Sequence, residues 1–207
     1  MRRVRLLLMV IFATAVWARP ALSLQETEIT MTDGEFWALI GQTSIYEGHP
    51  EQQLLALEST LQQRPAAEVA AFDAAFGRQV KRAYRWDLWG ALLVAEGGAS
   101  DDAFLYFRIW LVSKGRKAFE VVLDHPDDLA DLDFAPGPGG YYEFEEFGYV
   151  ARQVLASKQG GDPGGLPGDN TGGPAPTGPT FNDDPASLKA AYPKLWRKFS
   201  QHPLGGG

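Results

Sequence analysis

Apolar residues recur every three or four positions through most of this chain, which is the spacing of one face of a helix. Between residues 32 and 80 three such segments follow one another. Their apolar positions are Phe36, Trp37 and Ile40, then Leu54, Leu57 and Leu61, then Val69, Phe72, Phe76 and Val80. Thr32 and Glu35 form a capping box that predicts the start of the first helix. Pro50 and Pro65 stand where the next two begin, because proline is tolerated at the first helical position.

Residues 86–95, WDLWGALLVA, are apolar or glycine at every position except Asp87. A helix that is apolar on all sides is usually buried on all sides. The helical period that precedes this segment, together with its Ala and Leu content, favours a helix over a buried strand. We expect the helix to end at the glycine pair 97–98 and to lie deep inside the fold.

A further helix is predicted to start just after that glycine pair. Ser100 is a good N-cap, and Asp101 and Asp102 then fall in the first turn, where the helix dipole favours negative charge. Its core positions are Phe104, Phe107 and Leu111. Helices are also expected over residues 116–123 and 141–158, with a loop at residues 135–140.

The amino-acid composition of the chain changes after residue 158. Residues 159–187 are rich in Gly, Pro, Asp, Asn and Thr, and we expect a flexible linker that buries almost nothing. Residues 188–200 return to a helical pattern with many large apolar groups, which an exposed tail would not need. The sequence therefore predicts an all-α protein: one compact multi-helix domain over residues 24–158, the linker, and a C-terminal helix that packs back on the domain.

The first 23 residues have the layout of a secretory signal peptide. Arg2, Arg3 and Arg5 precede the apolar run at residues 6–17, which is shorter than the roughly 20 residues needed to span a bilayer. Cleavage is expected after Ser23, with Ala18 as the alternative position. We therefore expect export to the periplasm or the extracellular space, with no stable membrane anchor after cleavage.

The amino-acid composition limits the classes of partner and of functional site that the protein can have. The chain has 26 Asp and Glu against 19 Lys and Arg, a net charge of −7, and loss of the basic leader makes it more negative. Such a surface repels phosphate backbones, so no nucleic-acid partner is expected. The absence of cysteine excludes a disulfide, a thiol nucleophile and a Cys-ligated metal. The three histidines form no metal-binding spacing, so neither a metal nor a cofactor is predicted.

Asp87 is the first candidate site residue, because it is the one charge in an apolar segment. It could act as a general base or a cation ligand with a pKa raised by burial. We favour a structural role, in which Asp87 is buried and paired with Arg108 or Arg116 in preference to Arg85. A short Gly-Gly turn would make the two helices antiparallel neighbours, and buried charges are normally paired.

Carboxylates and aromatic rings supply the other candidates. Glu96, Asp101 and Asp102 could bind calcium through their oxygens. However, their spacing is not that of an EF-hand, and helix capping explains two of the three. Three tryptophans could line a ligand groove, although their helical spacing is typical of core positions. They are Trp86, Trp89 and Trp110.

Four segments together resemble a bacterial family of unknown function, numbered 4240. They are EFWALI at residues 35–40, AYRWDLWGA at 83–91, GGASDDAFLYFRIWLVSKGR at 97–116 and YPKLWRKF at 192–199. The resemblance covers most of residues 31–158 and the C-terminal helix. This chain differs in its export signal and its long Gly/Pro-rich linker. Because no established activity accompanies the family, the resemblance implies a shared fold unit and little chemistry.

No motif in the chain supplies a catalytic nucleophile: it has no GxSxG, no SxxK and no cysteine. We therefore expect a non-enzymatic binding or interaction module that recognises a protein or a small-molecule ligand. The alternative is a carboxylate-dependent hydrolase, with or without calcium, that uses Asp87, Asp101 and Asp102.

Overall fold

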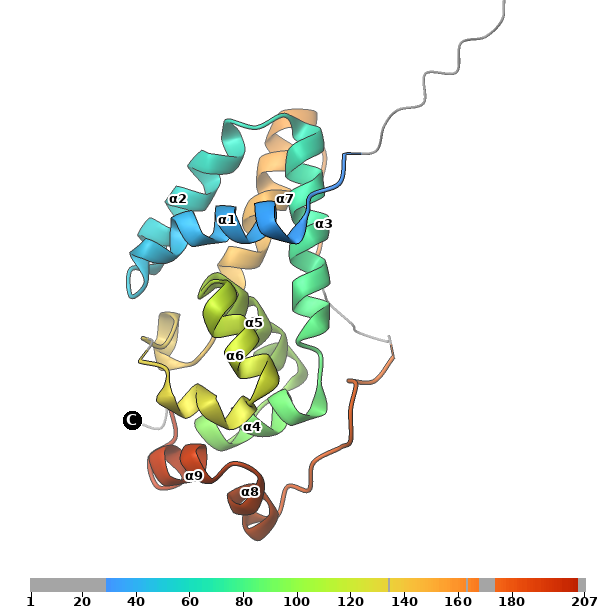
Figure 1. Cartoon of the computed structure of the whole chain (residues 1–207). Coiled ribbons are helices and arrows are strands. Elements are labelled where there is room, and N and C mark those ends of the chain that lie inside the picture. Colours follow the sequence, from blue (N-terminus) through green and yellow to red (C-terminus); the bar gives the residue numbers. More distant parts are fainter. Residues whose placement is uncertain (1–28, 134, 163, 168–173, 205–207) are drawn as a thin grey trace, which may run out of the picture.

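The computed structural model describes residues 29–133, 135–162, 164–167 and 174–204, and the expected signal peptide at residues 1–23 lies outside them. Within these ranges the fold is all-α, as predicted, with one isolated bridge between Arg85 and Thr177 and no strand (Figure 1). The helices are α1 (Asp33–Thr43), η1 (Ser44–Tyr46), α2 (Pro50–Gln62), α3 (Ala66–Arg82), α4 (Trp86–Glu96), α5 (Asp101–Ser113), α6 (Arg116–Asp124), η2 (Pro126–Asp131), η3 (Pro138–Gly140), α7 (Glu145–Gln159), α8 (Pro185–Ala191) and α9 (Pro193–Phe199).

The helix starts follow the caps that the sequence indicates. The Thr32 hydroxyl accepts from the Glu35 backbone N–H at 3.3 Å, and the Glu35 carboxylate accepts from the Thr32 N–H at 2.9 Å. The Ser100 hydroxyl accepts from the Ala103 N–H at 3.1 Å and begins α5. Gly97 ends α4 in the left-handed region, with φ of +70°, where glycine carries no Cβ penalty.

α5 runs through the middle of the molecule. It packs mainly against α7 and α3, whereas α1 and α2 complete one end of the domain and α4, α6 and η2 form the other (Figure 1). Phe104, Phe107, Trp110 and Leu111 of α5 are fully buried. Aromatic rings of α1, α3 and α7 meet beside them, at Phe36, Phe72, Phe76 and Phe147. The hydrophobic core is therefore continuous from one end of the domain to the other.

The described parts of the chain between α7 and α8 lie at two places on the domain: residues 160–162 and 164–167 beside α7, and residues 174–184 beside α4 and α8 (Figure 1). The chain leaves α7 beside the α2–α3 turn, where the Lys158 ammonium donates to the Gln62 carbonyl at 2.7 Å. We expected residues 159–187 to bury almost nothing. In the part that the structure describes, Pro167 and Pro176 are buried and Leu166 packs against Gly148 of α7. The composition alone did not predict these contacts: Gly148 leaves room for Leu166, and Pro167 lies beside Gly77 of α3.

The C-terminal helix also differs from expectation. The single helix predicted over residues 188–200 is two helices, α8 and α9, separated at Tyr192. Pro193 has no N–H with which to continue α8, so it begins a new helix instead. α8 starts earlier than predicted, at Pro185, because the Asp184 carboxylate accepts from the Ala186 and Ser187 N–H groups at 3.0 Å.

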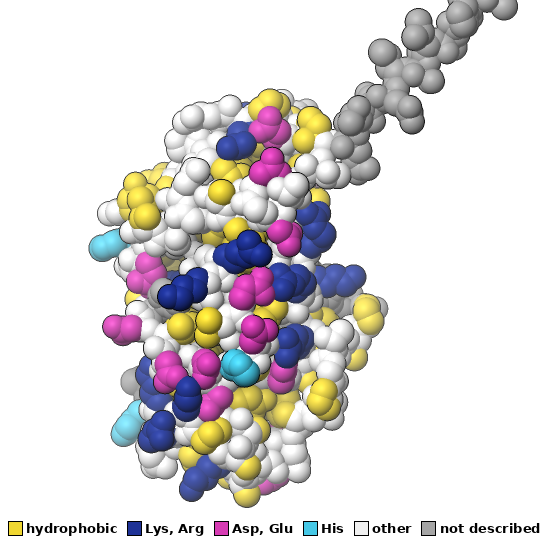
Figure 2. Space-filling model, in the orientation of Figure 1, with side chains coloured by type: hydrophobic (Ala, Val, Ile, Leu, Met, Phe, Trp, Pro, Cys, Tyr) yellow, Lys and Arg dark blue, Asp and Glu magenta, His cyan; other side chains and the backbone are white. Residues whose placement is uncertain are grey.

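The surface carries charges of both signs. On the face drawn in Figure 2, acidic and basic side chains are interspersed rather than gathered into one field. No described helix is long and apolar enough to cross a bilayer.

Candidate functional site: the surface along α4

α4, whose only charged residues are Asp87 and Glu96, is covered on one side by a distant part of the chain. Residues 177–204, here called the C-terminal segment, follow α4 from its first residue to its last. At the start of α4, the Trp86 N–H donates to the Thr177 carbonyl at 3.0 Å. At its end, the Leu204 N–H donates to the Ala95 carbonyl at 2.9 Å. We call the covered side of α4 and η2 the α4–η2 surface.

In the middle of α4, the absence of a side chain at Gly90 makes room for aromatic rings. A Cβ at this position would overlap the Tyr192 hydroxyl and would lie 3.0 Å from Cγ of Phe181. The Tyr192 hydroxyl donates to the Asp87 carbonyl at 2.8 Å. Burial raises the pKa of Tyr192 to about 12, and the carboxylates of Asp87 and Asp127 add to the rise. Tyr192 therefore remains a neutral donor at any physiological pH.

The apolar side chains of the C-terminal segment enter the core. Leu195 is fully buried, and Leu188, Tyr192 and Phe199 are each at most 8% exposed. The Phe199 ring meets the Tyr142 ring edge-on at 6.3 Å, so the segment reaches the aromatic core around α5. Burying a large apolar side chain contributes roughly 1.5–3 kcal/mol. The segment is thus anchored on the domain by packing as well as by hydrogen bonds.

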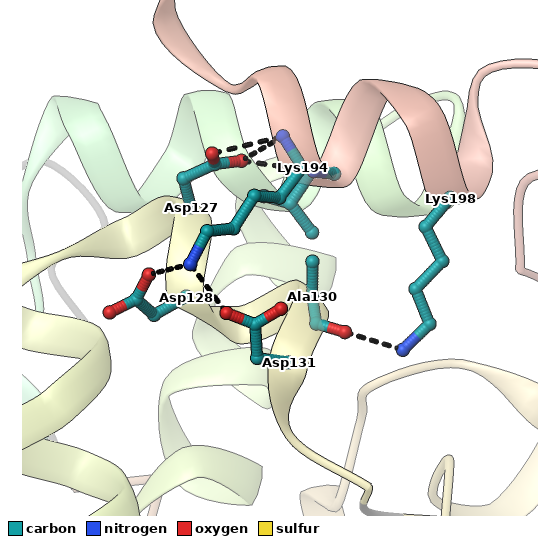
Figure 3. A network of polar contacts seen from close by, with 7 residues as sticks. Asp127, Asp128, Ala130, Asp131, Lys194 and Lys198 are labelled. Atoms are coloured by element: carbon teal, nitrogen blue, oxygen red, sulfur yellow. Dashed lines mark hydrogen bonds and ion pairs between the residues drawn. The ribbon is translucent and has the colours of Figure 1, made fainter.

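Charged groups of η2 hold the start of α9 (Figure 3). The Asp127 carboxylate accepts from the backbone N–H groups of Lys194, at 3.0 Å, and Leu195, at 2.9 Å, and so caps α9 from outside the helix. The Lys194 ammonium pairs with Asp128 at 2.7 Å and also with Asp131. Both ion pairs hold the pKa of Lys194 above its ordinary value. We call Asp127, Asp128 and Asp131 the η2 carboxylates.

The tryptophans named as candidates divide between this surface and the core. Trp86 and Trp89 stack on each other at 5.4 Å, and Phe181 of the C-terminal segment meets Trp86 edge-on at 6.1 Å. Trp89 also stacks on Phe104 at 4.7 Å. Trp110 is fully buried in α5. Trp86 therefore lines the α4–η2 surface, Trp89 lies between Trp86 and the core residue Phe104, and Trp110 is a core residue.

The prediction for Asp87 is wrong in burial and in partner. Its side chain is 37% exposed and pairs with Arg85, whose Nε lies 3.0 Å from one carboxylate oxygen. Arg85 also donates to the Leu123 carbonyl at 2.8 Å. The reason lies in the path of α5, which packs mainly against α7 and α3 rather than along α4. Arg108 therefore lies beside α3 and does not reach Asp87.

Arg108 is buried, but among carbonyl oxygens and rings. Its Nε donates to the Phe104 carbonyl at 3.2 Å and its Nη1 to the Val80 carbonyl, near the end of α3, at 3.3 Å. The guanidinium lies over the Tyr84 ring at 4.6 Å, which is cation–π geometry. Arg116, the other predicted partner of Asp87, is exposed at the first position of α6.

The carboxylates of the hydrolase hypothesis lie at opposite ends of α4. Asp87 is in its first turn, whereas Asp101 and Asp102 are exposed in the first turn of α5, beyond the far end. At 1.5 Å rise per residue, about 14 Å of helix separates Asp87 from Glu96. Among the described residues no group of three or more His, Cys, Asp or Glu could hold a metal ion. Nothing in this geometry brings the three aspartates together.

Glu96 is the acidic residue whose environment is most unusual. It is 8% exposed, and one carboxylate oxygen accepts from the Tyr142 N–H at 2.7 Å. Burial raises its pKa to about 7, and the Glu143 charge adds to the rise. Because the Tyr142 ring also contacts Phe199, Tyr142 connects Glu96 to the C-terminal segment.

The η2 carboxylates and Lys194 were not among the residues singled out from the sequence. The pair of aspartates after Pro126 and the lysine after Pro193 were visible as separate features. Their contact spans 66 positions, from Asp128 to Lys194, and hydrophobic periodicity carries no signal at that separation.

A family model described as "Protein of unknown function (DUF4240)" matches residues 31–156. No curated protein and no solved structure matches the chain. The matched range contains all of α4 and η2 and ends before the C-terminal segment that covers them.

Proposed function

The chain belongs to the DUF4240 family of proteins of unknown function, and we propose that it is an exported interaction module. Its α4–η2 surface binds a helical segment of a partner protein, and it catalyses no reaction. The C-terminal segment occupies this surface from within the same chain. A partner segment competes with it for the same contacts.

The way the surface holds the C-terminal segment supports this function. Recognition of a helical peptide commonly combines buried apolar anchors with polar contacts that fix its position. Here Leu195 and Phe199 are the anchors, Thr177 pairs with the backbone at the start of α4, and Asp127 caps the helix start. These contacts are made by one continuous segment that lies outside the matched family range. A surface built for such a segment is equipped to bind another of the same kind.

Tethering determines how strongly the surface is occupied. A segment joined to its binding surface within one chain has an effective concentration on the order of millimolar. A partner segment must therefore bind considerably more tightly than the tethered one, or act when the tethered one has been released. The protein would thus exist in a closed state, with the surface covered, and an open state that binds the partner.

Export is the second part of the proposal, and it rests on the basic residues and apolar run of residues 1–23. It places the partner outside the cytoplasm. N-terminal sequencing of the protein recovered from a bacterial host tests it. We expect the mature chain to begin after Ser23 or after Ala18. A chain that keeps Met1 and stays in the cytoplasmic fraction would overturn this part alone.

The binding function is tested by cutting the connection without removing the segment. A specific protease site is inserted after Gly161, which is exposed, and the purified full chain is cleaved. We expect the C-terminal fragment to remain with the domain on gel filtration at micromolar concentration, and an excess of a synthetic peptide of residues 177–204 to displace it. If the fragment separates from the domain at once, the α4–η2 surface does not bind a free segment and the proposed function fails.

A further inference from the structure

We propose that the η2 carboxylates make the α4–η2 surface selective for a partner segment that has a lysine at the second position of a short helix. This inference depends on the proposed binding function and adds the chemistry of the partner. The partner segment is basic along one edge and apolar along the face that meets α4.

Two different kinds of contact are made by the η2 carboxylates (Figure 3). Asp127 accepts from the backbone N–H groups of Lys194 and Leu195, so it recognises a helix start whatever its sequence. Asp128 and Asp131 accept from the Lys194 ammonium, so they recognise a side chain. Asp127 therefore fixes where the incoming helix begins, and Asp128 and Asp131 select a lysine as its second residue.

Lysine suits this position because of charge and shape. Three carboxylates on one short helix repel one another, and a cation placed between two of them relieves that repulsion. The ammonium group is compact and has three donors, so it can serve Asp128 and Asp131 together. An acidic residue at the same position would add a fourth negative charge. The surface should therefore bind an acidic segment much more weakly than a basic one.

The rest of α9 extends the same pattern. Lys198, four residues after Lys194, donates to the Ala130 carbonyl at 2.7 Å, so the two lysines lie on the edge of α9 that faces η2 (Figure 3). Leu195 and Phe199 have the same spacing and are buried against the domain. Arg197 is exposed. The partner that fits is thus an amphipathic segment with lysine and an apolar residue in successive positions, repeated four residues later.

The experiment uses the full chain carrying Lys194→Glu as host, because its own C-terminal segment is then repelled by Asp128 and Asp131. Hydrogen exchange over α8 and α9 shows whether the segment is released. Three fluorescent peptides of residues 177–204 are added: the natural sequence, Lys194→Glu, and Arg197→Glu. The last has the same change in charge at an exposed position, so it is the matched control.

We expect the natural and Arg197→Glu peptides to bind the host within about twofold of each other, and the Lys194→Glu peptide to bind at least about tenfold more weakly. Adding Asp128→Lys and Asp131→Lys to the host should restore attraction to its own Glu at position 194. Its segment should then dock again, and peptide binding should fall.

Each contrary outcome has one meaning. If all three peptides bind alike, the surface binds segments but does not select lysine, and this inference is wrong while the proposed function stands. If hydrogen exchange over α8 and α9 is no faster in the host than in the natural chain, the η2 carboxylates do not contribute to docking, and the inference is again wrong. If the segment is released and no peptide binds, the proposed function itself is wrong.

Discussion

Tyr192 lies against Gly90 so closely that its ring and hydroxyl occupy the space a side chain at position 90 would need. The two residues come from α4 and from the junction of α8 and α9, and the Tyr192 hydroxyl is also hydrogen-bonded to the Asp87 carbonyl. A glycine inside a helix normally lowers stability by about 0.5–1 kcal/mol relative to alanine. Here the same glycine permits the C-terminal segment to dock, which reverses the expected effect of replacing it.

Gly90→Ala should therefore destabilise the protein by about 1–3 kcal/mol, because Tyr192 must move and lose its hydrogen bond. Gly41→Ala is the control: Gly41 lies in α1 with open space around it, so the alanine should stabilise by about 0.5–1 kcal/mol. Urea unfolding of both variants measures the direction in which each substitution changes the free energy of unfolding. Equal stabilisation by both would show that Tyr192 is not held against α4.

Asp87→Asn should cost less than about 1 kcal/mol, because the aspartate is partly exposed and its pairing with Arg85 is a surface ion pair. Asp101→Asn, at the exposed start of α5, should have an effect of similar size. Both are measured by urea unfolding. A loss of 3 kcal/mol or more for Asp87→Asn alone would mean that Asp87 anchors the core after all.

Stability should depend on pH through Glu96. Its pKa is about 7 in the folded protein against an ordinary 4.5, so between these values the folded state holds a proton that the unfolded state has lost. The free energy of unfolding should therefore fall as pH rises from about 4.5 to 7, by an amount on the order of 1–3 kcal/mol, and level off above that. Glu96→Gln keeps an acceptor for the Tyr142 N–H and should remove this slope. Unfolding curves at pH 5 and pH 8 compare the two proteins, and an unchanged slope in the variant would assign the titration to another group.

Calcium should leave the melting temperature within about 1 °C of the value in EDTA, because Asp87 and the pair Asp101 and Asp102 lie at opposite ends of α4. Thermal unfolding with millimolar calcium and with EDTA measures this. A rise of many degrees would instead support the carboxylate hydrolase, and the three aspartates would then be the first residues to replace.

Helix starts and fold class could be predicted from the sequence because their signals are local. Thr32 with Glu35, and Ser100 with the residue three positions on, satisfy backbone groups of their own helices. Pro193 is a local signal for a helix break, since proline cannot continue a helix, but the apolar pattern on both sides of it favoured one continuous helix.

The partner of Asp87 could not be predicted in this way. It depends on the direction that α5 takes after Gly97, and a turn of given length allows several directions. The contact between Lys194 and the η2 carboxylates was hidden for a related reason: both sides look like ordinary solvated charges until the fold brings them together.

The cover over α4 also has a consequence for synthesis. α4 is made well before residues 177–204, so while the chain is being produced the apolar side of α4 has nothing to cover it. During that interval Trp86 and Leu93, which lie beside the C-terminal segment in the folded protein, are exposed to other molecules, as in aggregation-prone intermediates. A premature stop that removes α8 and α9 would make this transient state permanent. Such truncated chains should be cleared by chaperones and proteases rather than accumulate as a smaller folded protein.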